Sequence, residues 1–191
     1  MKQKGVSTVP EKYYLTTNES LLLIIDLQDK LMNAMSEKEG VYKNTRLLLT
    51  AANQYRLPVV VTEQYPKGLG PTAVEIAEAL EEHQLVEKNA FDACTEDTNR
   101  ILREHGRKQI IVCGSETHIC VYQTVRHLLD LGYQVFVTAD AVCSRFKANY
   151  KNGLQLMAEM GAVIITAEGI VFDWMKVSGT PEFKVISPLL K

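Results

Sequence analysis

Gln109-Ile-Ile-Val-Cys-Gly-Ser-Glu-Thr-His-Ile-Cys120 is the stretch of this chain that decides its predicted fold. Its first part is an apolar, β-branched run typical of a buried strand, and Gly114 then predicts a turn. Apolar residues return at helical spacing after Cys120, beginning with Val121 and Val125. A buried strand, a glycine turn and a helix in this order are typical of a parallel α/β sheet.

The same stretch places Cys120 where nucleophilic chemistry is favoured. The first N–H groups of a helix lack partners inside the helix, and the helix dipole is positive there. Both effects favour the thiolate, which is the nucleophilic form of cysteine. The sequence therefore predicts a reactive thiol at Cys120 beside backbone donors for an oxyanion, so a hydrolase is the first hypothesis.

The rest of the chain alternates between short apolar runs and segments of helical period. The predicted strands are Leu21–Asp26, Pro58–Thr62, Gln84–Lys88, Gln109–Cys113, Gln134–Thr138 and Ala162–Thr166. The predicted helices are Tyr42–Tyr55, Thr72–Leu80, Asp97–His105, Cys120–Leu131 and Asn149–Met160. This alternation predicts a single three-layer α/β/α domain over residues 1–191, with a six-stranded, mostly parallel sheet in the order 3-2-1-4-5-6.

Two segments lie outside these predicted elements. The loop Glu63–Pro71 is rich in glycine and proline and follows a strand. It is therefore expected at the carboxyl edge of the sheet, where such folds bind ligands. The C-terminal segment Pro181–Lys191 is expected to be a tail that packs on the body or on a partner subunit.

Composition and charge disfavour several classes of protein. An apolar share of 46% and a charged share of 23% are ordinary for a globular chain. A formal net charge of −2 gives no reason to expect nucleic acid or an anionic membrane as a partner. The longest apolar run, Leu21–Ile25, is too short to cross a bilayer. The start, Met1-Lys-Gln-Lys-Gly-Val6, lacks the apolar region of a signal peptide, so a cytoplasmic protein is expected.

The four cysteines are expected to be free thiols, because none belongs to a Cys-x-x-Cys pair. The histidines show no zinc-binding spacing with them, and no metal or other cofactor is expected. Cys113 lies inside a predicted strand and is expected to be a small buried side chain. The roles of Cys94 and Cys143 stay open.

Asp26 ends the first predicted strand after five apolar residues. A carboxylate at the end of a buried strand is costly unless it is paired or functional. If the first and fourth strands are neighbours, Asp26 lies near Cys120 at the topological switch point. One alternative is a carboxylate bonded to loop amides. Another is a phosphoacceptor or magnesium ligand, which favours Asp-x-Asp, whereas this chain has Asp26-Leu-Gln-Asp29.

Other polar residues follow predicted strands at the same edge. Lys88 ends the third strand, where its charge would stabilise a thiolate or an oxyanion, although most lysines are solvated surface charges. His118 suggests a Cys–His dyad with Cys120, but proximity in sequence does not give that geometry. Asp140 and Arg145 are expected to form an ion pair that fixes a loop, and the alternative is that Arg145 contacts substrate.

Together, Asp26, Lys88 and Gly114-Ser-Glu-Thr-His-Ile-Cys120 resemble the isochorismatase-like cysteine hydrolases, which include nicotinamidases and N-carbamoylsarcosine amidases. The resemblance runs from about Leu21 to the C-terminus. It is closest to isochorismatase-domain-containing hydrolases of uncertain substrate. Those proteins share stretches like Thr62-Glu-Gln-Tyr-Pro-Lys-Gly-Leu-Gly-Pro-Thr72, Asp140-Ala-Val-Cys-Ser-Arg145 and Pro181-Glu-Phe-Lys184.

The resemblance implies a Rossmann-like isochorismatase fold and a catalytic triad of Asp26, Lys88 and Cys120. It also implies a cis peptide between Ser115 and Glu116, which turns the Glu116 N–H toward the oxyanion together with that of Cys120. The implied reaction is hydrolysis of a small amide-like C–N bond, in which Cys120 attacks the carbonyl and water releases the acyl group from a thioester.

One departure from the family pattern concerns the metal. Metal-binding nicotinamidases carry Asp-x-His after the second strand, where this chain has Glu63-Gln-Tyr65. No Asp-x-His occurs anywhere in the chain, so metal-independent hydrolysis is expected and nicotinamide is a poor candidate substrate. Hydrolysis of isochorismate is disfavoured as well, because the enzymes named for it lack this cysteine.

Two alternatives come from other functional classes. A redox sensor would use Cys120 as an oxidisable thiol, but no resolving cysteine is evident. A non-catalytic binding protein on the same fold is the other alternative. For the hydrolase, the partner is a small-molecule substrate, and Phe91, Tyr122 and Tyr65 are candidate pocket residues. A homo-oligomer is expected because members of the family commonly assemble.

Overall fold

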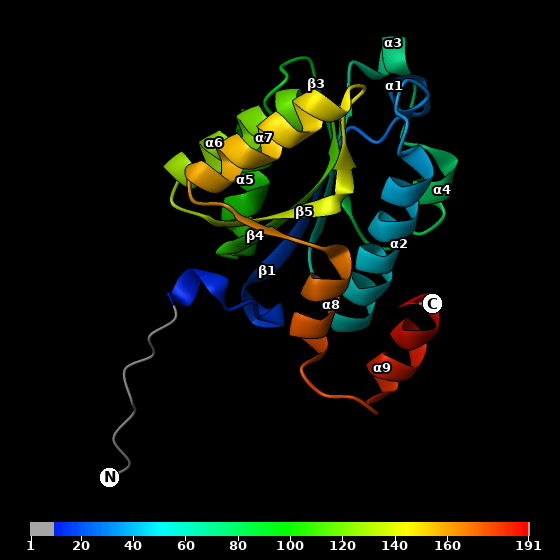
Figure 1. Ribbon diagram of the computed structural model, residues 1–191, viewed down its shortest axis with the longest axis vertical. Coiled ribbons are helices and arrows are strands. Elements are labelled where there is room, and N and C mark those ends of the chain that lie inside the picture. Colours follow the sequence, from blue (N-terminus) through cyan, green and yellow to red (C-terminus); the bar gives the residue numbers. More distant parts are fainter. Residues whose placement is uncertain (1–9, 191) are drawn as a thin grey trace.

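Six parallel strands form one sheet in the computed structural model, which describes residues 10–190 (Figure 1). The strands are β1 (Ser20–Ile25), β2 (Val59–Gln64), β3 (Gln84–Lys88), β4 (Gln109–Ser115), β5 (Gln134–Cys143) and β6 (Val163–Ile165). Their order is β3-β2-β1-β4-β5-β6, and every neighbouring pair is parallel. The predicted fold class and strand order are confirmed.

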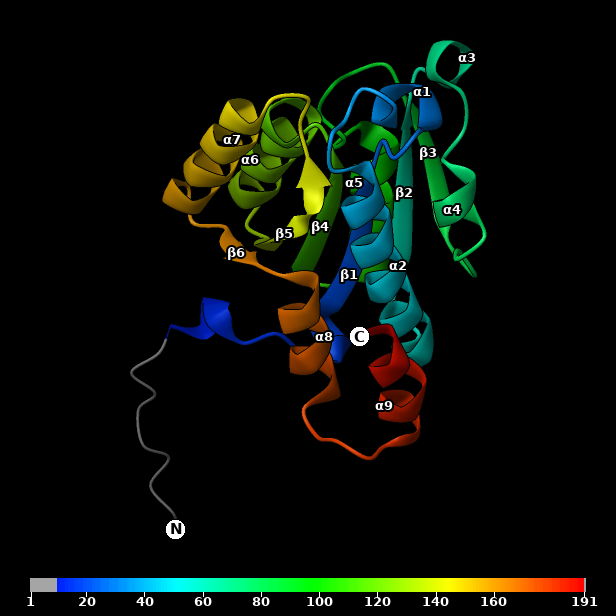
Figure 2. The same ribbon diagram turned by 45° about the vertical axis from the view of Figure 1, so that its right-hand side comes forward.

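Helices cover both faces of this sheet (Figures 1 and 2). One face is covered by α2 (Lys38–Tyr55) and α8 (Ala167–Met175), and the other by α5 (Glu96–His105), α6 (Tyr122–Asp130) and α7 (Lys147–Glu159). Alternate residues of β1 enter the two cores, with Leu22 and Ile24 on one side and Leu23 and Ile25 on the other. Because both faces are covered, β1 is an uninterrupted apolar run in which every residue is buried.

Several short elements connect these layers. They are α1 (Asp29–Met32), α3 (Pro66–Leu69), α4 (Val74–Ala77), α9 (Pro181–Ile186), a π-helical turn (Thr117–Val121) and three 3₁₀ turns (Glu11–Tyr13, Thr17–Glu19, Ser187–Leu190). The predicted helix Thr72–Leu80 is therefore shorter than expected. The C-terminal segment contains α9, whose Ile186 is fully buried in the core beneath α2. Helices of one turn or so are too short to produce a helical period in the sequence.

Three strands continue beyond their predicted ends, and the first of them, β2, reaches Gln64. β4 reaches Ser115 and β5 reaches Cys143, and these two residues pair with each other. The register shifts between Val112 and Gly114, so the pairing continues past an irregularity. The residues at these strand ends are mostly small or polar, so they carry no apolar pattern from which a strand would be predicted.

The N-terminal segment Met1–Val6, on which the expectation of no signal peptide rests, lies outside the described residues. Within residues 10–190, no helix combines the length and the apolar character that crossing a membrane requires.

The carboxyl ends of four strands meet at one edge of the sheet. Ile25 of β1 pairs with Thr62 on one side and with Gly114 on the other. Farther out, Gln64 of β2 pairs with Lys88 of β3. The connections leave in opposite directions between β1 and β4, so this edge is the topological switch point where ligands of such folds bind.

Gly114 allows β4 to approach the end of β1 closely. Its φ is 128°, and a Cβ atom built there would overlap the carbonyl oxygen of Ile25. Only glycine fits this backbone without displacing β1.

Replacing Gly114 by alanine is expected to lower the free energy of unfolding by about 3 kcal/mol or more, because backbone strain and steric overlap add. Urea unfolding followed by circular dichroism measures the change. Gly40→Ala is the matched control, since Gly40 lies in α2 with no atom within 4 Å of the added methyl group. This control should be neutral or gain about 0.5–1 kcal/mol. Equal losses in the two variants would contradict the close approach.

Candidate active site

Asp26 follows β1 directly, and its left-handed backbone, with φ 53°, turns the chain out of the sheet. Its N–H donates to the Thr62 carbonyl at 3.1 Å. The carboxylate is fully buried, and both of its oxygens have partners. Oδ1 accepts from the Thr62 hydroxyl at 2.7 Å, and Oδ2 accepts from Lys88 Nζ at 2.6 Å.

Lys88 is the last residue of β3, and its ammonium reaches past β2 to Asp26. It also donates to Gln64 Oε1 at 2.8 Å and to the carbonyls of Ala90 and Phe91 at 3.2 and 3.3 Å. The side chain has no exposure to solvent. A buried ammonium is tolerated only where protein acceptors replace water, and these four acceptors do so. Lys88 is therefore not a solvated surface charge.

The environment of Asp26 pulls its pKa in two directions. Burial raises the pKa above the usual value of 3.8, while the Lys88 ammonium, the Thr62 hydroxyl and the Cys120 thiol lower it in part. The net direction is upward. Asp26 is thus a stronger base than an exposed aspartate, which suits a proton acceptor.

Cys120 lies in the π-helical turn Thr117–Val121, so α6 begins two residues later than predicted. The side chain is buried, and its thiol lies near enough to the Asp26 carboxylate for each group to influence the pKa of the other. The backbone N–H of Glu116 also contacts the sulfur. The structure therefore brings Asp26, Lys88 and Cys120 together, with the carboxylate in contact with both the ammonium and the thiol.

Burial of Cys120 works against the thiolate that its position at the start of a helix favours. Burial, followed by the charge of Asp26, raises the pKa of Cys120 to about 12, and the Lys88 ammonium offsets only part of this. A helix N-terminus favours a thiolate at a partly exposed site, but here desolvation outweighs it. The direction of this shift favours a neutral thiol beside the Asp26 carboxylate.

The peptide bond between Ser115 and Glu116 is cis. Hydrogen bonds hold this segment between the end of β1 and the turn that carries the nucleophile. The Ser115 hydroxyl donates to the carbonyl of Asp26 at 3.0 Å. The carbonyl of Glu116 accepts from the N–H groups of Ile119 and Val121 at 3.0 and 3.2 Å.

Arg145 fixes the side chain of Glu116. Its backbone N–H and its Nε donate to the Glu116 carboxylate at 3.0 and 3.2 Å. The predicted ion pair between Asp140 and Arg145 is wrong, because β5 extends through Asp140 and separates the two. Asp140 Oδ1 instead accepts from the Ala167 N–H at 2.8 Å, at the start of α8. Arg145 therefore has the expected structural role, but its partner is Glu116 and not Asp140.

His118 forms no dyad with Cys120. Its Nδ1 lies 3.0 Å from Ser144 Oγ, and its Nε2 lies 3.2 Å from Asn149 Nδ2. Both ring nitrogens are thus engaged away from the thiol.

The three candidate pocket residues come from segments that adjoin the triad. Tyr65 follows β2, and its N–H donates to the Lys88 carbonyl at 2.8 Å. Phe91 is exposed, and its own carbonyl accepts from Lys88 Nζ. Tyr122 follows the π-helical turn, and the guanidinium of Arg126 lies 5.3 Å from its ring centroid. Their contact with substrate stays a prediction.

Residues that sequence analysis did not single out complete the site. Thr62 and Gln64 bond to the buried pair, and Gln28 ties the loops after β1 and β2 together. The Gln28 side chain donates to the carbonyls of Gln64 and Gly70 at 3.1 and 2.5 Å and accepts from the Gln64 N–H at 2.8 Å. The only sequence signal was their position near strand ends, which polar residues of no function also occupy.

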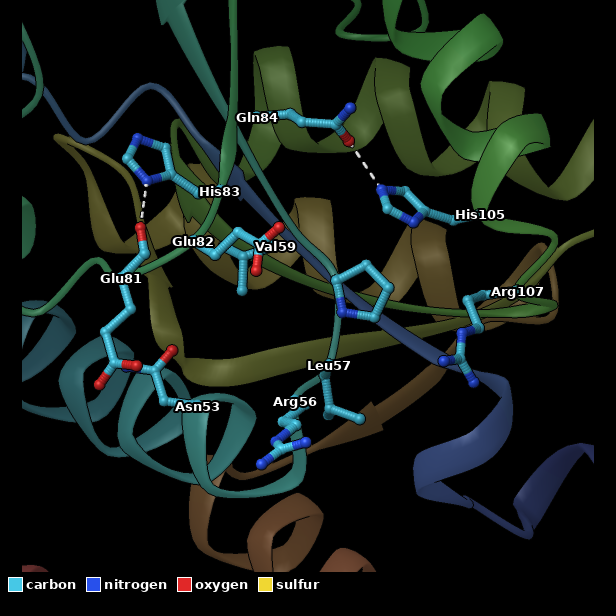
Figure 3. Close-up of a pocket in the computed structure, with 11 residues that line it drawn as sticks. Asn53, Arg56, Leu57, Val59, Glu81, Glu82, His83, Gln84, His105 and Arg107 are labelled. Atoms are coloured by element: carbon cyan, nitrogen blue, oxygen red, sulfur yellow. Dashed lines mark hydrogen bonds between the residues drawn. The ribbon is translucent and has the colours of Figure 1, made fainter.

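A separate hollow of about 620 Å³ lies at the opposite edge of the sheet (Figure 3). It is lined by Val59 and Gln84, the first residues of β2 and β3, together with His105 and Arg107. Because it opens at the amino ends of these strands, it is not the space next to Cys120.

Comparison with known proteins identifies the family. The family model described as Isochorismatase domain matches residues 20–169. The chain belongs to the isochorismatase family. A relative among curated proteins is the secreted isochorismatase effector Isc1 of Phytophthora sojae, 36% identical over 93% of this chain and 87% of that protein. Isochorismatase domain-containing protein 2 of Danio rerio is 36% identical over 92% of this chain and 89% of its own length.

A solved structure supports the same membership. The structure described as MAR1 ribonuclease from Caenorhabditis elegans superposes with a TM-score of 0.88 at 32% identity, covering 93% of this chain and 92% of that one. This family comprises isochorismatase-like hydrolases, so the general reaction class follows from membership, whereas the bond that is cleaved does not.

Lys88→Met is expected to lower the free energy of unfolding by about 3–5 kcal/mol at pH 7.5, because it leaves the Asp26 carboxylate buried without a cation. A carboxyl group whose pKa is raised in the folded state binds more protons there than in the unfolded state. Its contribution to the free energy of unfolding of the protein therefore falls as pH rises. Loss of Lys88 raises that pKa further. The deficit of the variant should therefore shrink as pH is lowered toward 5.

Urea unfolding at several pH values measures this dependence. Lys108→Met, at an exposed position before β4, is the control and should be nearly neutral at every pH. Addition of Asp26→Asn to Lys88→Met should restore much of the stability at pH 7.5. A deficit independent of pH would rule out an uncompensated Asp26 charge.

Proposed function

We propose that the protein is a metal-independent cysteine hydrolase that cleaves a small amide-like C–N bond through a thioester on Cys120. The observation that carries this proposal is the buried Asp26 carboxylate, which accepts from Lys88 Nζ at 2.6 Å and contacts the Cys120 thiol. A nucleophile, a base and a cation in mutual contact are the parts that acyl transfer requires.

In the first step, Asp26 takes the thiol proton while the Cys120 sulfur attacks the substrate carbonyl. The negative charge that forms on the carbonyl oxygen is stabilised by the backbone N–H groups of Glu116 and Cys120. The contact of the Glu116 N–H with the sulfur supports this role. Lys88 stabilises the charge on Asp26 before the transfer.

In the second step, the proton on Asp26 passes to the leaving nitrogen, the C–N bond breaks, and an amine or ammonia departs. Water then attacks the thioester, with Asp26 accepting a proton from it, and the acid product leaves as the Cys120 thiol reforms. No electron acceptor or metal is needed for this balance.

The raised pKa values support proton transfer at the moment of attack. A thiol with a pKa of about 12 is a weak acid, and burial makes its acceptor Asp26 a stronger base than usual. The negative charge forms only when a bound substrate supplies a carbonyl oxygen to carry it, so the protein stabilises this charge in the transition state and not before it. This feature disfavours the redox-sensor alternative, which requires an exposed thiol of low pKa.

The other cysteines support the same choice. Cys94, Cys113 and Cys143 are buried free thiols, each near a partner other than Cys120. No resolving cysteine for Cys120 is thus found in the part of the chain that the structure describes. A purely binding role would leave the three polar side chains of the triad buried without a function.

A small substrate suits a nucleophile that is only 5% exposed. The solved structures of this fold include an N-carbamoylsarcosine amidase from Thermoplasma acidophilum, with a TM-score of 0.68 at 21% identity over 78% of this chain and 97% of that one. At this identity the likeness is one of fold, and it motivates the choice of compounds for a screen.

Cys120→Ala is expected to reduce turnover at least about 1,000-fold, because no other group in the site attacks the carbonyl. Cys113→Ala is the matched control, since Cys113 is a fully buried cysteine that packs in β4 away from the carboxylate. It should retain most activity. Turnover by Cys120→Ala would contradict the thioester mechanism.

Asp26→Asn is expected to reduce kcat/KM by about 100- to 10,000-fold, the range of a lost general base. The wild-type rate should also fall on the acid side with an apparent pKa above 3.8, because Asp26 must be ionised to accept the proton and its pKa is raised. The pH dependence of kcat/KM gives this value. A rate unchanged in Asp26→Asn would exclude its role as base.

The substrate screen covers small amides, ureas and carbamoyl compounds, with release of amine or ammonia as the measurement and mass spectrometry to detect an acyl group on Cys120. A short RNA serves as a separate arm, because the Caenorhabditis elegans neighbour is described as a ribonuclease. RNA cleavage that persists in Cys120→Ala, without amide hydrolysis, would replace this proposal.

We also propose that the protein is a homo-oligomer. A neighbour from Escherichia coli, the YcaC gene product, is described as an octameric hydrolase of unknown specificity, with a TM-score of 0.84 at 23% identity. Light scattering of the purified chain measures its assembly, and a mass equal to one chain would contradict this part of the proposal.

A further inference from the structure

Asp92, Cys94 and His127 form a cluster of metal-ligating side chains that the proposed hydrolysis does not use. Asp92 and Cys94 belong to the loop between β3 and α5, and His127 belongs to α6. One ligand atom from each residue lies within 4.8 Å of the other two. A carboxylate oxygen, a sulfur and a ring nitrogen thus converge from two segments that are separated in sequence by β4.

The three ligand atoms lie near enough to one another for small side-chain movements to bring them to the spacing of a tetrahedral site. With Zn–S bonds of about 2.3 Å and Zn–N and Zn–O bonds of about 2.0–2.2 Å, ligand atoms lie roughly 3.3–3.7 Å apart. Asp92 Oδ2 and His127 Nδ1 are now 2.7 Å apart as a hydrogen-bonded pair. Insertion of an ion requires these two atoms to separate by less than about 1 Å.

The backbone around the cluster is already fixed. The Cys94 N–H donates to Asp92 Oδ1 at 2.8 Å, which leaves Oδ2 directed at His127. Asn99 Nδ2 donates to the Cys94 carbonyl at 3.0 Å. Hydrogen bonds that orient ligating side chains in this way are a regular property of metal sites.

The cluster is also accessible. The side chains of His127 and Asp92 are 37% and 29% exposed, and both line a hollow on the surface, whereas Cys94 is buried beneath them. An ion can therefore enter from solvent and keep a water molecule as its fourth ligand. Arg126 and Asp130 line the same hollow, and their opposite charges largely offset one another.

We propose that Asp92 Oδ2, Cys94 Sγ and His127 Nδ1 bind a divalent transition-metal ion of the zinc type. One thiolate, one imidazole and one carboxylate suit Zn²⁺ and disfavour Mg²⁺ and Ca²⁺, which prefer oxygen ligands alone. On binding, the Cys94 thiol releases its proton to solvent, and a neutral His127 carries its proton on Nε2.

The site supports the proposed active site without belonging to it. Ala93, between two of the ligands, donates to Thr124 Oγ1 at 2.8 Å, and that hydroxyl donates to the Cys120 carbonyl at 2.6 Å. The same loop supplies Phe91, whose carbonyl accepts from Lys88. An ion at the cluster thus fixes a loop that contacts Lys88 directly and Cys120 through Thr124.

Titration of the chelator-treated full chain with Co²⁺ tests the proposal independently of catalysis. The expected result is one Co²⁺ per chain, with visible bands of tetrahedral cobalt and a thiolate-to-cobalt charge-transfer band in the near ultraviolet. Zn²⁺ should displace the Co²⁺ and remove these bands. Cys94→Ser should abolish the charge-transfer band, and His127→Gln should weaken Co²⁺ binding by about 100-fold or more.

Two cysteine variants are the matched controls. Cys143→Ser changes another buried thiol, and Cys120→Ser changes the proposed nucleophile, and both should bind Co²⁺ as the parent does. Circular dichroism checks that each variant is folded, and the partly exposed His127 offers a variant that does not disturb the core.

Several outcomes would overturn the proposal. One is the absence of a charge-transfer band at saturating Co²⁺. Another is a band that persists in Cys94→Ser, or an affinity for Co²⁺ that is unchanged in His127→Gln. A band lost in Cys120→Ser but kept in Cys94→Ser would place the metal at the triad instead.

Discussion

The buried contact between the Asp26 carboxylate and the Lys88 ammonium is the interaction on which the site depends. Two charges out of water persist only where each has further hydrogen-bond partners, and here Thr62 and Gln64 provide them. Because β2 separates β1 from β3, the connection requires a side chain as long as lysine. The pair thereby fixes the ends of three strands relative to one another and holds the carboxylate against Cys120.

Much of the architecture was predictable because it follows from local sequence. An uninterrupted apolar run from Leu21 to Ile25 requires cover on both faces, and both faces are covered. The strand order then brings the ends of β1 and β4 together, which places Asp26 and the segment before Cys120 at one edge. The polar residues at these strand ends therefore lie together, as predicted, and their role in catalysis stays a proposal.

The features that sequence analysis missed depend on contacts between distant segments. The protonation of Cys120 is set by its burial and by Asp26, neither of which follows from its position before a helix. The partner of Arg145 depends on where β5 ends, and the role of Gln28 depends on two loops meeting. The cluster of Asp92, Cys94 and His127 matches no motif, because its histidine comes from a helix beyond an intervening strand.

The high pKa of Cys120 has a consequence for how the protein meets reactive molecules. Burial and the charge of Asp26 hold the pKa of Cys120 well above its usual value, so little of the thiol is ionised at neutral pH. Peroxides and general thiol reagents attack the ionised form, so the resting nucleophile is protected from them. Selective covalent ligands of this site are then electrophiles that resemble the substrate closely enough for Asp26 to remove the proton of the Cys120 thiol. The intrinsic reactivity of an electrophile is a poor guide in choosing such ligands.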